Sequence, residues 1–286
     1  MSVAPVTWRT RHAVLSTADH TLVMGIVNVT PDSFSDGGTW ENVDAAIRRG
    51  RELLAAGADI IDVGGESTRP GAEGVPVDEE IRRVVPVVEG LAAYGAVVSV
   101  DTSKPEVAAA AIVAGAGIVN DVTGLADDAM RGICAGGEVG VVIMHMRGSP
   151  RTMQADPRYE DVVADVASFL ADRAGMALDA GIGRDRIVVD PGIGFGKTFD
   201  HNLALLGDLD AIGGGFPVLV GTSRKRFLGE VLDRAGRPSE PGDRDIATAA
   251  TVALAVAGGA SIVRVHDVAS AVDSARTADA IVRAQP

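Results

Sequence analysis

The sequence contains few of the residues that characterise several classes of protein. Cys134 is the only cysteine in 286 residues, so no disulfide can form within the chain. We expect its thiol to lie buried in a helix and to be unreactive, as free cysteines usually are. A single cysteine is also consistent with a reducing cytoplasm. Aromatic residues make up 3% of the chain, so the core must be built from Val, Ile, Leu and Ala.

Positive charge and long apolar segments are also scarce. Lys and Arg total 26 against 39 Asp and Glu, a net charge of −13. This argues against a nucleic-acid partner, which would need a basic face. No apolar run approaches the roughly 18 residues of a membrane-spanning helix, and the first residues lack the apolar stretch of a signal peptide. We therefore expect a soluble, cytoplasmic protein with no membrane partner.

The residues that are present alternate regularly between two patterns. Short runs rich in Val and Ile are typical of parallel strands buried on both faces, and they lie at 22–27, 59–63, 96–100, 117–120, 139–144, 186–189, 217–220 and 261–265. Helical patterns follow them at 42–56, 77–93, 105–114, 124–137, 159–180, 200–212, 243–257 and 267–283.

This alternation predicts a single α/β domain over residues 1–286, a (β/α)₈ barrel of the TIM class. An open, doubly wound sheet is the alternative. Residues 7–21 are expected to form a small hairpin before the first strand. In such barrels the chemistry lies at the carboxyl ends of the strands, and the residues that follow each run are therefore the candidates for a site.

Every predicted strand ends in polar residues. A lone Asp after a strand is commonly a helix N-cap, but polar groups at all eight strand ends favour one shared site. Asp101, Asn120 and Asp190 offer carboxylates and an amide that can hold the amino-pyrimidinone edge of a flat heterocycle. Lys225 adds a donor, and Met144 and Phe195 are candidate apolar faces.

A second set of strand-end residues is cationic. Arg69, Arg264, His266 and the run at 223–226 stand out in an acidic protein, and concentrated cations favour anions such as phosphate. Asn28 beside such anions is a candidate ligand for Mg²⁺, which prefers few protein ligands together with substrate phosphates.

Two glycine-rich segments are not nucleotide-binding motifs. In residues 191–198, PGIGFGKT, Pro191 stands where a P-loop requires its first glycine. The segment also follows the sixth predicted strand, whereas a P-loop follows an early one. We interpret it as a loop before a helix, with Lys197 solvated. The segment 64–67 lacks the dinucleotide-binding spacing.

Several long motifs resemble those of the dihydropteroate synthases. They are IVNVTPDSFSDGG (26–38), IIDVGGESTRPGA (60–72), VDTSKPEVA (100–108), NDVTG (120–124), DPGIGFGKTFDHN (190–202), GTSRKRFLG (221–229) and RVHDV (264–268). They run in the family's order from about residue 22 to the C-terminus. The resemblance implies condensation of a dihydropterin pyrophosphate with p-aminobenzoate, which releases pyrophosphate in folate biosynthesis.

The resemblance also implies a role for individual residues. The pterin would be held by Asp101, Asn120, Met144, Asp190 and Lys225. The pyrophosphate would be bound by Asn28, Thr68, Arg264 and His266, with Mg²⁺ on Asn28. The p-aminobenzoate pocket would comprise Phe34, Thr68, Pro70, Phe195, Ser223 and Lys225, and the first two strand-end loops would contribute Asp36 and Arg69.

The implied mechanism needs no protein nucleophile. Pyrophosphate departs, the pterin methylene becomes cationic beside Asp101, and the neutral amine attacks. This suits a rim in which we expect neither a reactive Cys nor a Ser–His pair. Because Phe34 and Pro70 are present and DPGIGFGKT has no insertion, we expect sensitivity to sulfonamides. The family is usually dimeric, and the apolar segment 246–257 could form the interface or simply pack on the barrel.

Two other functions remain open at this point. One is a corrinoid-dependent methyltransferase that uses methyltetrahydrofolate on a similar barrel. It would need no pyrophosphate site, and Arg264, His266 and the run at 223–226 speak against it. The other is a paralogue that binds pterins without catalysis, which the retention of all the motifs disfavours.

Overall fold

The computed structural model describes residues 5–30, 39–67, 71–72, 74–149 and 152–284. Among these residues, eight parallel strands form one sheet. They are β3 (Leu22–Asn28), β4 (Ile60–Gly64), β5 (Val98–Asp101), β6 (Ile118–Asp121), β7 (Gly140–Met144), β8 (Ile187–Asp190), β9 (Leu219–Val220) and β10 (Ile262–Val265). The order is β8-β7-β6-β5-β4-β3-β10-β9, and a parallel bridge between Val189 and Val218 joins the two ends of the sheet. The predicted barrel is confirmed, and the open sheet is wrong.

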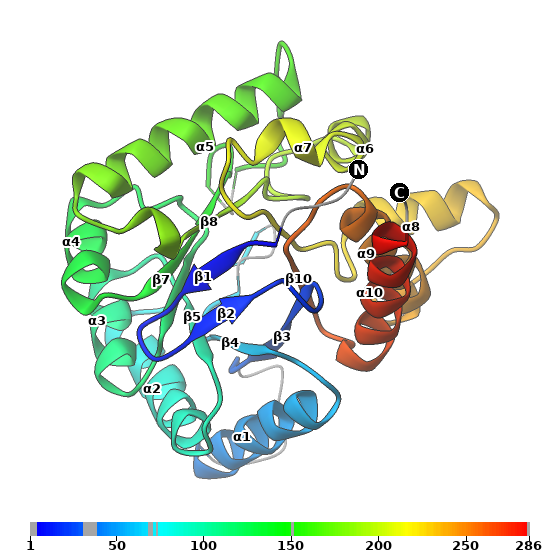
Figure 1. The fold of residues 1–286 in the computed structure, drawn as a ribbon. Helices are drawn as coiled ribbons and strands as arrows, with labels where there is room; N and C mark the ends of the chain where they lie inside the picture. Colours follow the sequence, from blue (N-terminus) through cyan, green and yellow to red (C-terminus); the bar gives the residue numbers. More distant parts are fainter. Residues whose placement is uncertain (1–4, 31–38, 68–70, 73, 150–151, 285–286) are drawn as a thin grey trace.

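Helices surround the strands (Figure 1). They are α1 (Thr39–Ala55), α2 (Val77–Ala93), α3 (Pro105–Val113), α4 (Asp128–Gly137), α5 (Val162–Asp179), α6 (Phe199–Gly207), α7 (Leu209–Ile212), α8 (Arg226–Arg234), α9 (Asp245–Ala257) and α10 (Val268–Arg283). Two differ from the prediction. The helix expected at 200–212 is divided at Asp208, whose φ of −142° is not helical. Helix α8 was not predicted; it begins at Arg226, the last residue of the polar run at 223–226.

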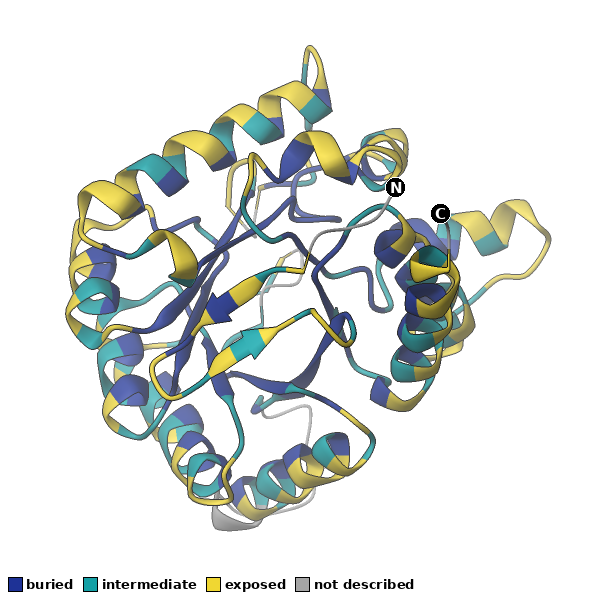
Figure 2. Ribbon diagram, viewed as in Figure 1, coloured by how far each residue is buried: buried dark blue, intermediate teal, exposed yellow. Residues whose placement is uncertain are grey.

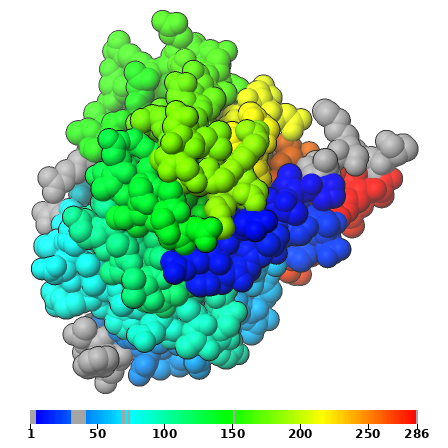
Figure 3. Space-filling view, turned by 60° about the vertical axis from the view of Figure 1, so that its left-hand side comes forward, coloured from blue at the N-terminus to red at the C-terminus, as the bar shows by residue number. Residues whose placement is uncertain are grey.

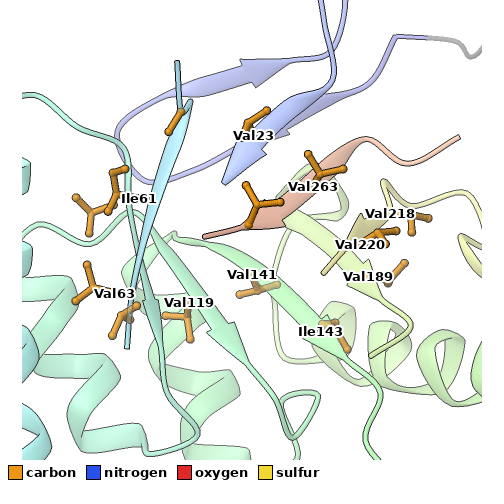
Figure 4. Packing of buried hydrophobic residues seen from close by; sticks show 14 of the residues in the cluster. Val23, Ile61, Val63, Val119, Val141, Ile143, Val189, Val218, Val220 and Val263 are labelled. Carbon is orange, nitrogen blue, oxygen red and sulfur yellow. The ribbon is translucent and has the colours of Figure 1, made fainter. Parts of the chain in front are cut away.

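The core has two layers, because side chains along a strand alternate between opposite faces. Outward-facing residues such as Val63, Val119, Ile143 and Val263 pack against the helices (Figure 4). Inward-facing residues such as Met24, Ile60, Ile118 and Ile262 fill the barrel. The barrel strands are buried except at half-buried Asn28, Asp101 and Arg264, whereas the helices expose their outer faces (Figure 2). Cys134 is buried in α4, and burial raises the pKa of its thiol to about 12, as expected of an unreactive cysteine.

The predicted N-terminal hairpin closes the amino end of the barrel. It consists of β1 (Thr7–Arg9) and β2 (Val14–Ser16), lies across the strands in Figure 1, and forms part of the surface in Figure 3. Trp8, 1% exposed, belongs to the apolar cluster inside the barrel. Its indole N–H donates to the carbonyl oxygen of Arg186 at 2.9 Å. Because the hairpin covers the amino end of the barrel, a site can form only at the carboxyl ends of the strands.

Candidate active site

The inward-facing side chains of the barrel change from apolar to polar between one inward position of a strand and the next, two residues later. Ile60, Ile118, Val188 and Ile262 belong to the inner apolar cluster. Two residues further along the same four strands, and on the same face, lie Asp62, Asn120, Asp190 and Arg264. The register aligns Asn28, Gly64, Asp101 and Asn120 as successive Cα partners on β3 to β6. One polar layer therefore covers the apolar interior.

Arg264 links two carboxylates within this layer. Its Nε donates to Asp62 Oδ2 at 2.6 Å, and its Nη2 donates to Asp101 Oδ2 at 2.7 Å. Asn120 Nδ2 donates to the same oxygen of Asp62 at 3.1 Å. The site thus joins residues of β4, β5, β6 and β10 in one hydrogen-bonded network with two potential negative charges and one positive.

Burial dominates the protonation of this network. Loss of solvation raises the pKa of Asp101 to about 7, with Arg264 acting to lower it and Asp62 to raise it. Burial also acts to lower the pKa of Arg264, but Asp62 and Asp101 raise it above its ordinary value. Arg264 is therefore a permanent cation, while Asp101 changes charge near neutral pH.

Asp190 lies at the end of β8, and it has a different set of partners. Its Oδ1 accepts a hydrogen bond from the backbone N–H of Gly192 at 2.7 Å. Burial raises its pKa to about 6, against the opposing effects of the Gly192 hydrogen bond and of Lys225, Arg264 and Lys197. Asp190 is thus a second acceptor within the barrel, flanked by cations.

Gly192 and Gly196 allow the loop after β8 to fold against the loop after β7. At Gly192 φ is +65° and an added Cβ would lie 1.9 Å from the carbonyl oxygen of His145; at Gly196 φ is +64° and the distance to the oxygen of Arg147 would be 2.7 Å. Only glycine fits such positions. These glycines therefore serve a close approach of two backbones, which agrees with rejecting a P-loop.

Lys197 is not solvated, contrary to the sequence interpretation. It is 3% exposed, and its Nζ lies 2.9 Å from His145 Nδ1 and 3.0 Å from the carbonyl oxygen of Phe195. Burial lowers its pKa to about 7. The pKa of His145 falls to about 3, first through burial and then through Lys197. The pair joins the loops after β7 and β8 behind the site.

Phe195 and Met144 form an apolar wall, as predicted. They pack in one buried cluster with Val122 and Met153. The Nζ of Lys225 lies 3.9 Å from the centre of the Phe195 ring, within the range of a cation–π contact. A flat ring that packed against Met144 and Phe195 would therefore lie next to a cation.

Ser223 and His266 form a pair at the rim, which the sequence interpretation did not expect. Ser223 Oγ lies 2.9 Å from His266 Nδ1 and accepts the backbone N–H of His266 at 3.1 Å. The run at 223–226 is not one cationic cluster, since Arg224 forms an ion pair with Asp245 and Arg226 is exposed at the start of α8. The sequence alone could not show that the side chains of this run point to different partners.

Comparison with known proteins agrees with this arrangement. A family model described as pterin binding enzyme matches residues 24–266. The chain belongs to the pterin binding enzymes. It is 45% identical to the dihydropteroate synthase of Bacillus subtilis over 276 residues, 96% of this chain and 93% of that protein. It is 51% identical over 251 residues, 87% of this chain, to a probable bifunctional folylpolyglutamate synthase/dihydropteroate synthase of Haloferax volcanii, of which it spans 29%.

Solved structures of pterin binding enzymes share the whole fold. The Xanthomonas albilineans dihydropteroate synthase with 4-aminobenzoic acid has a TM-score of 0.90 and 47% identity, covering 99% of this chain and 100% of that one. The Yersinia pestis dihydropteroate synthase in a sulfonamide drug complex has a TM-score of 0.89 and 41% identity, covering 96% and 99%.

Asp62 is the member of this polar layer that the sequence analysis missed. It lies within an apolar strand, two residues before the strand end, and its Oδ1 is buried without a hydrogen-bond partner among the described residues. The same holds for Ser99 Oγ on the neighbouring strand, whose Cα is the register partner of Asp62. A polar residue inside a Val- and Ile-rich run was the available signal.

The remaining candidate residues divide into two groups. Asn28 lies half-buried at the end of β3, in register with the polar layer. Five others fall outside the described residues: Phe34, Asp36, Thr68, Arg69 and Pro70. No helix in the described part of the chain has the length and apolar character to span a membrane.

Proposed function

We propose that the site joins 6-hydroxymethyl-7,8-dihydropterin pyrophosphate to p-aminobenzoate, with release of pyrophosphate and 7,8-dihydropteroate in folate biosynthesis. The observation that carries this proposal is the buried network of Asp62, Asp101, Asn120 and Arg264 beside Asp190. Relatives that cover nearly the whole chain are dihydropteroate synthases, and one similar enzyme was solved with 4-aminobenzoic acid.

The pterin would lie against the polar layer. Asp190, Asn120 and the unpartnered Oδ1 of Asp62 offer acceptors and an amide to its amino-pyrimidinone edge. Met144 and Phe195 would pack on its face. Lys225, held over Phe195, would donate to its edge. The unpartnered Oδ1 of Asp62 would thus gain a partner when the substrate binds, which favours this heterocycle over an apolar one.

Catalysis would be electrostatic. The C–O bond between the pterin methylene and pyrophosphate breaks, and the oxygen keeps the electron pair. Asp101 in its ionised form would stabilise the resulting cation, and Arg264 and His266 would stabilise the departing anion. The amine nitrogen of p-aminobenzoate then forms the new C–N bond and loses one proton to solvent. Because Arg264 already donates to two carboxylates, it would reach the anion with its remaining N–H groups.

The Ser223–His266 pair would orient the imidazole rather than create a nucleophile. Ser223 Oγ already accepts the backbone N–H of His266, so its own proton can go to Nδ1. This contact favours the tautomer with the proton on Nε2. Nε2 is then a donor for an anionic oxygen, in keeping with the predicted pyrophosphate role of His266. Ser223 is buried.

Mg²⁺ on Asn28 is part of the proposal. In the described part of the chain no three His, Cys, Asp or Glu residues form a metal-binding group, but Mg²⁺ commonly takes one or two protein oxygens and completes its shell with substrate phosphates and water. Asn28 fits this role, because its amide oxygen is the kind of ligand that Mg²⁺ takes and it lies at the end of β3 in register with the polar layer. Mg²⁺ there would neutralise charge on the departing pyrophosphate.

We further propose a cytoplasmic homodimer. Its support is α9, where Ile246 and Leu254 are 80% and 68% exposed on the outer face. Contiguous apolar patches mark interaction surfaces, and Ile246 and Leu254 lie about two helical turns apart on α9. Sedimentation of the wild type and of an Ile246→Glu, Leu254→Glu variant tests the dimer: we expect a dimeric wild type and a monomeric variant.

A pyrophosphate-release assay tests the activity. With both substrates and Mg²⁺, we expect equal amounts of pyrophosphate and dihydropteroate; without p-aminobenzoate, release should fall strongly. A methyltransferase or a pterin-binding paralogue would give no dihydropteroate, and either result would refute the proposal. Adding sulfamethoxazole tests the predicted drug sensitivity, which is supported by the sulfonamide complex of the Y. pestis enzyme. An inhibition constant far above the KM for p-aminobenzoate would contradict that sensitivity.

A further inference from the structure

A strained turn connects two parts of the site. Residues 222–225 form a β-turn in which the backbone N–H of Lys225 donates to the carbonyl oxygen of Thr222 at 3.1 Å. The third residue of the turn, Arg224, has a φ of +59°. Turns with a positive φ at this position normally place glycine there, because a left-handed conformation is unfavourable for residues with a Cβ.

The turn places its two neighbours in different parts of the site. Ser223 precedes Arg224 and contacts His266 at 2.9 Å. Lys225 follows it and lies 3.9 Å from the centre of the Phe195 ring. Any other backbone conformation at Arg224 would redirect one of these side chains. The strain therefore lies between the predicted anion-binding and ring-binding parts of the site, where strained residues tend to occur.

The first turns of α9 hold Arg224 by its side chain and by both backbone groups. Its guanidinium donates to both carboxylate oxygens of Asp245, each at 2.8 Å. Its backbone N–H donates to Thr248 Oγ1 at 3.2 Å, and its carbonyl oxygen accepts from Arg244 Nη1 at 3.2 Å. Bidentate Arg–carboxylate pairs fix orientation as well as distance.

We infer that Asp245 is a positioning residue of the enzyme: through its two hydrogen bonds to Arg224 it keeps the turn at 222–225 in its left-handed form and so places Ser223 and Lys225 in the site. Asp245 is linked to the site through Arg224, which donates to both of its carboxylate oxygens. The inference rests on the proposed function, since it assigns the turn to that site.

Two substitutions of Arg224 isolate the backbone conformation. Arg224→Ala and Arg224→Gly both remove the guanidinium and its ion pair, but glycine adopts a positive φ without penalty. We expect kcat/KM of Arg224→Ala to be about five- to thirtyfold below that of Arg224→Gly, the ratio that the left-handed penalty of a non-glycine residue implies. Asp245→Ala removes the two hydrogen bonds of the Arg224 side chain and should resemble Arg224→Ala.

The kinetic constants distinguish positioning from stability alone. Misplacing Lys225 should raise the KM for p-aminobenzoate, and misplacing His266 should lower kcat. A merely structural ion pair would lower the unfolding temperature and leave both constants of the folded enzyme unchanged. Glu230→Ala is the control, because it removes an exposed Arg234–Glu230 pair on the adjoining helix α8, and we expect wild-type constants.

Crystal structures of the variants test the inference without relying on turnover. We expect the 2.9 Å contact between Ser223 and His266 to persist in Arg224→Gly and to be lost in Arg224→Ala and Asp245→Ala. Equal kcat/KM values for the two Arg224 variants, or an unchanged turn in Asp245→Ala, would overturn the inference. A wild type that makes no dihydropteroate would refute the proposed function instead, and the structures would still decide the role of Asp245.

Discussion

The two ends of the barrel are built from the same strands but serve different purposes. At the amino end, Trp8 of the hairpin closes a cluster of aliphatic side chains. At the carboxyl end, two residues further along the strands, the inward positions carry Asp62, Asn120, Asp190 and Arg264. The first arrangement stabilises the fold by removing apolar surface from water. The second buries charge, which opposes folding unless partners are found.

The difference shows in how completely polar groups are paired. At the amino end, Asp59 accepts from His20 and from the backbone N–H of Val23, and Asp279 accepts twice from Thr21. At the carboxyl end, Asp62 Oδ1 and Ser99 Oγ have no hydrogen-bond partner within the described residues. Buried polar groups without partners cost stability, and proteins commonly retain such costs where function needs them.

Removing the apolar plug should have the largest effect. We expect Trp8→Ala to lower the free energy of unfolding by about 3–5 kcal/mol, as truncation of a buried Trp does. The turnover of the folded enzyme should be unchanged, since Trp8 lies at the end of the barrel opposite the polar layer. Urea unfolding and kcat measured well below the unfolding midpoint check both points.

Trp8→Phe is the matched control for the plug. It keeps most of the ring volume and loses the hydrogen bond to the carbonyl oxygen of Arg186, so we expect a loss of about 1 kcal/mol. A large fall in kcat for either variant under folded conditions would show that the two ends of the barrel are not independent.

One chemical change made at both ends sharpens the comparison further. Asp101→Asn removes the carboxylate that would stabilise the pterin cation, and we expect kcat/KM to fall by about 10²- to 10³-fold. Asp59→Asn makes the same change at the amino end of β4. Because Asp59 contacts only structural groups there, its variant should lose stability by about 1–2 kcal/mol and keep its turnover.

The pH dependence gives a second measurement for Asp101. Because burial raises its pKa to about 7, the reactive carboxylate is lost as pH falls through neutrality, and kcat/KM of the wild type should fall with it. The pH profile of Asp101→Asn should lack this fall in kcat/KM at acidic pH. If kcat/KM of the variant still fell at acidic pH as in the wild type, a group other than Asp101 would be responsible.

Local sequence patterns were sufficient to predict the fold. Each predicted strand lies within a few residues of an observed one because buried parallel strands need continuous apolar runs. The helix α8 was missed because the polar run that leads into it was interpreted as part of a site. Its helical period was in fact present in the sequence, since Phe227, Leu228, Val231 and Leu232 recur at the spacing of one helix face.

The site was less predictable, because its contacts join distant parts of the chain. The types of Asp101, Asn120, Asp190 and Arg264 were evident at strand ends, but the bond between Arg264 and Asp62 spans 202 residues. Burial was also invisible: Lys197 follows two glycines like an exposed loop residue and is enclosed by His145 and Phe195. Pairing of Ser223 with His266 required the closed barrel.

The smallest predicted effect is the change with pH in the free energy of unfolding that buried Asp190 causes at the carboxyl end of the barrel. Burial raises the pKa of Asp190 to about 6, above the value of 3.8 for an ordinary Asp. Between these values the folded state binds more protons than the unfolded state, so this carboxyl stabilises the fold at low pH and loses that contribution as pH rises through about 6. Asp190→Asn has no such titration, and its side-chain oxygen can still accept from Gly192.

The stability of the wild type relative to Asp190→Asn should therefore fall by about 1–1.5 kcal/mol between pH 5 and pH 7.5, from about 1.4 kcal/mol per pKa unit. Urea unfolding at the two pH values measures this difference. Asp185→Asn, on an exposed carboxylate paired with Arg9 at the amino end, should show little dependence on pH over the same range. If Asp190→Asn behaved like Asp185→Asn, Asp190 would carry no cost of burial, and the contrast between the two ends would rest on Asp62 and Asp101 alone.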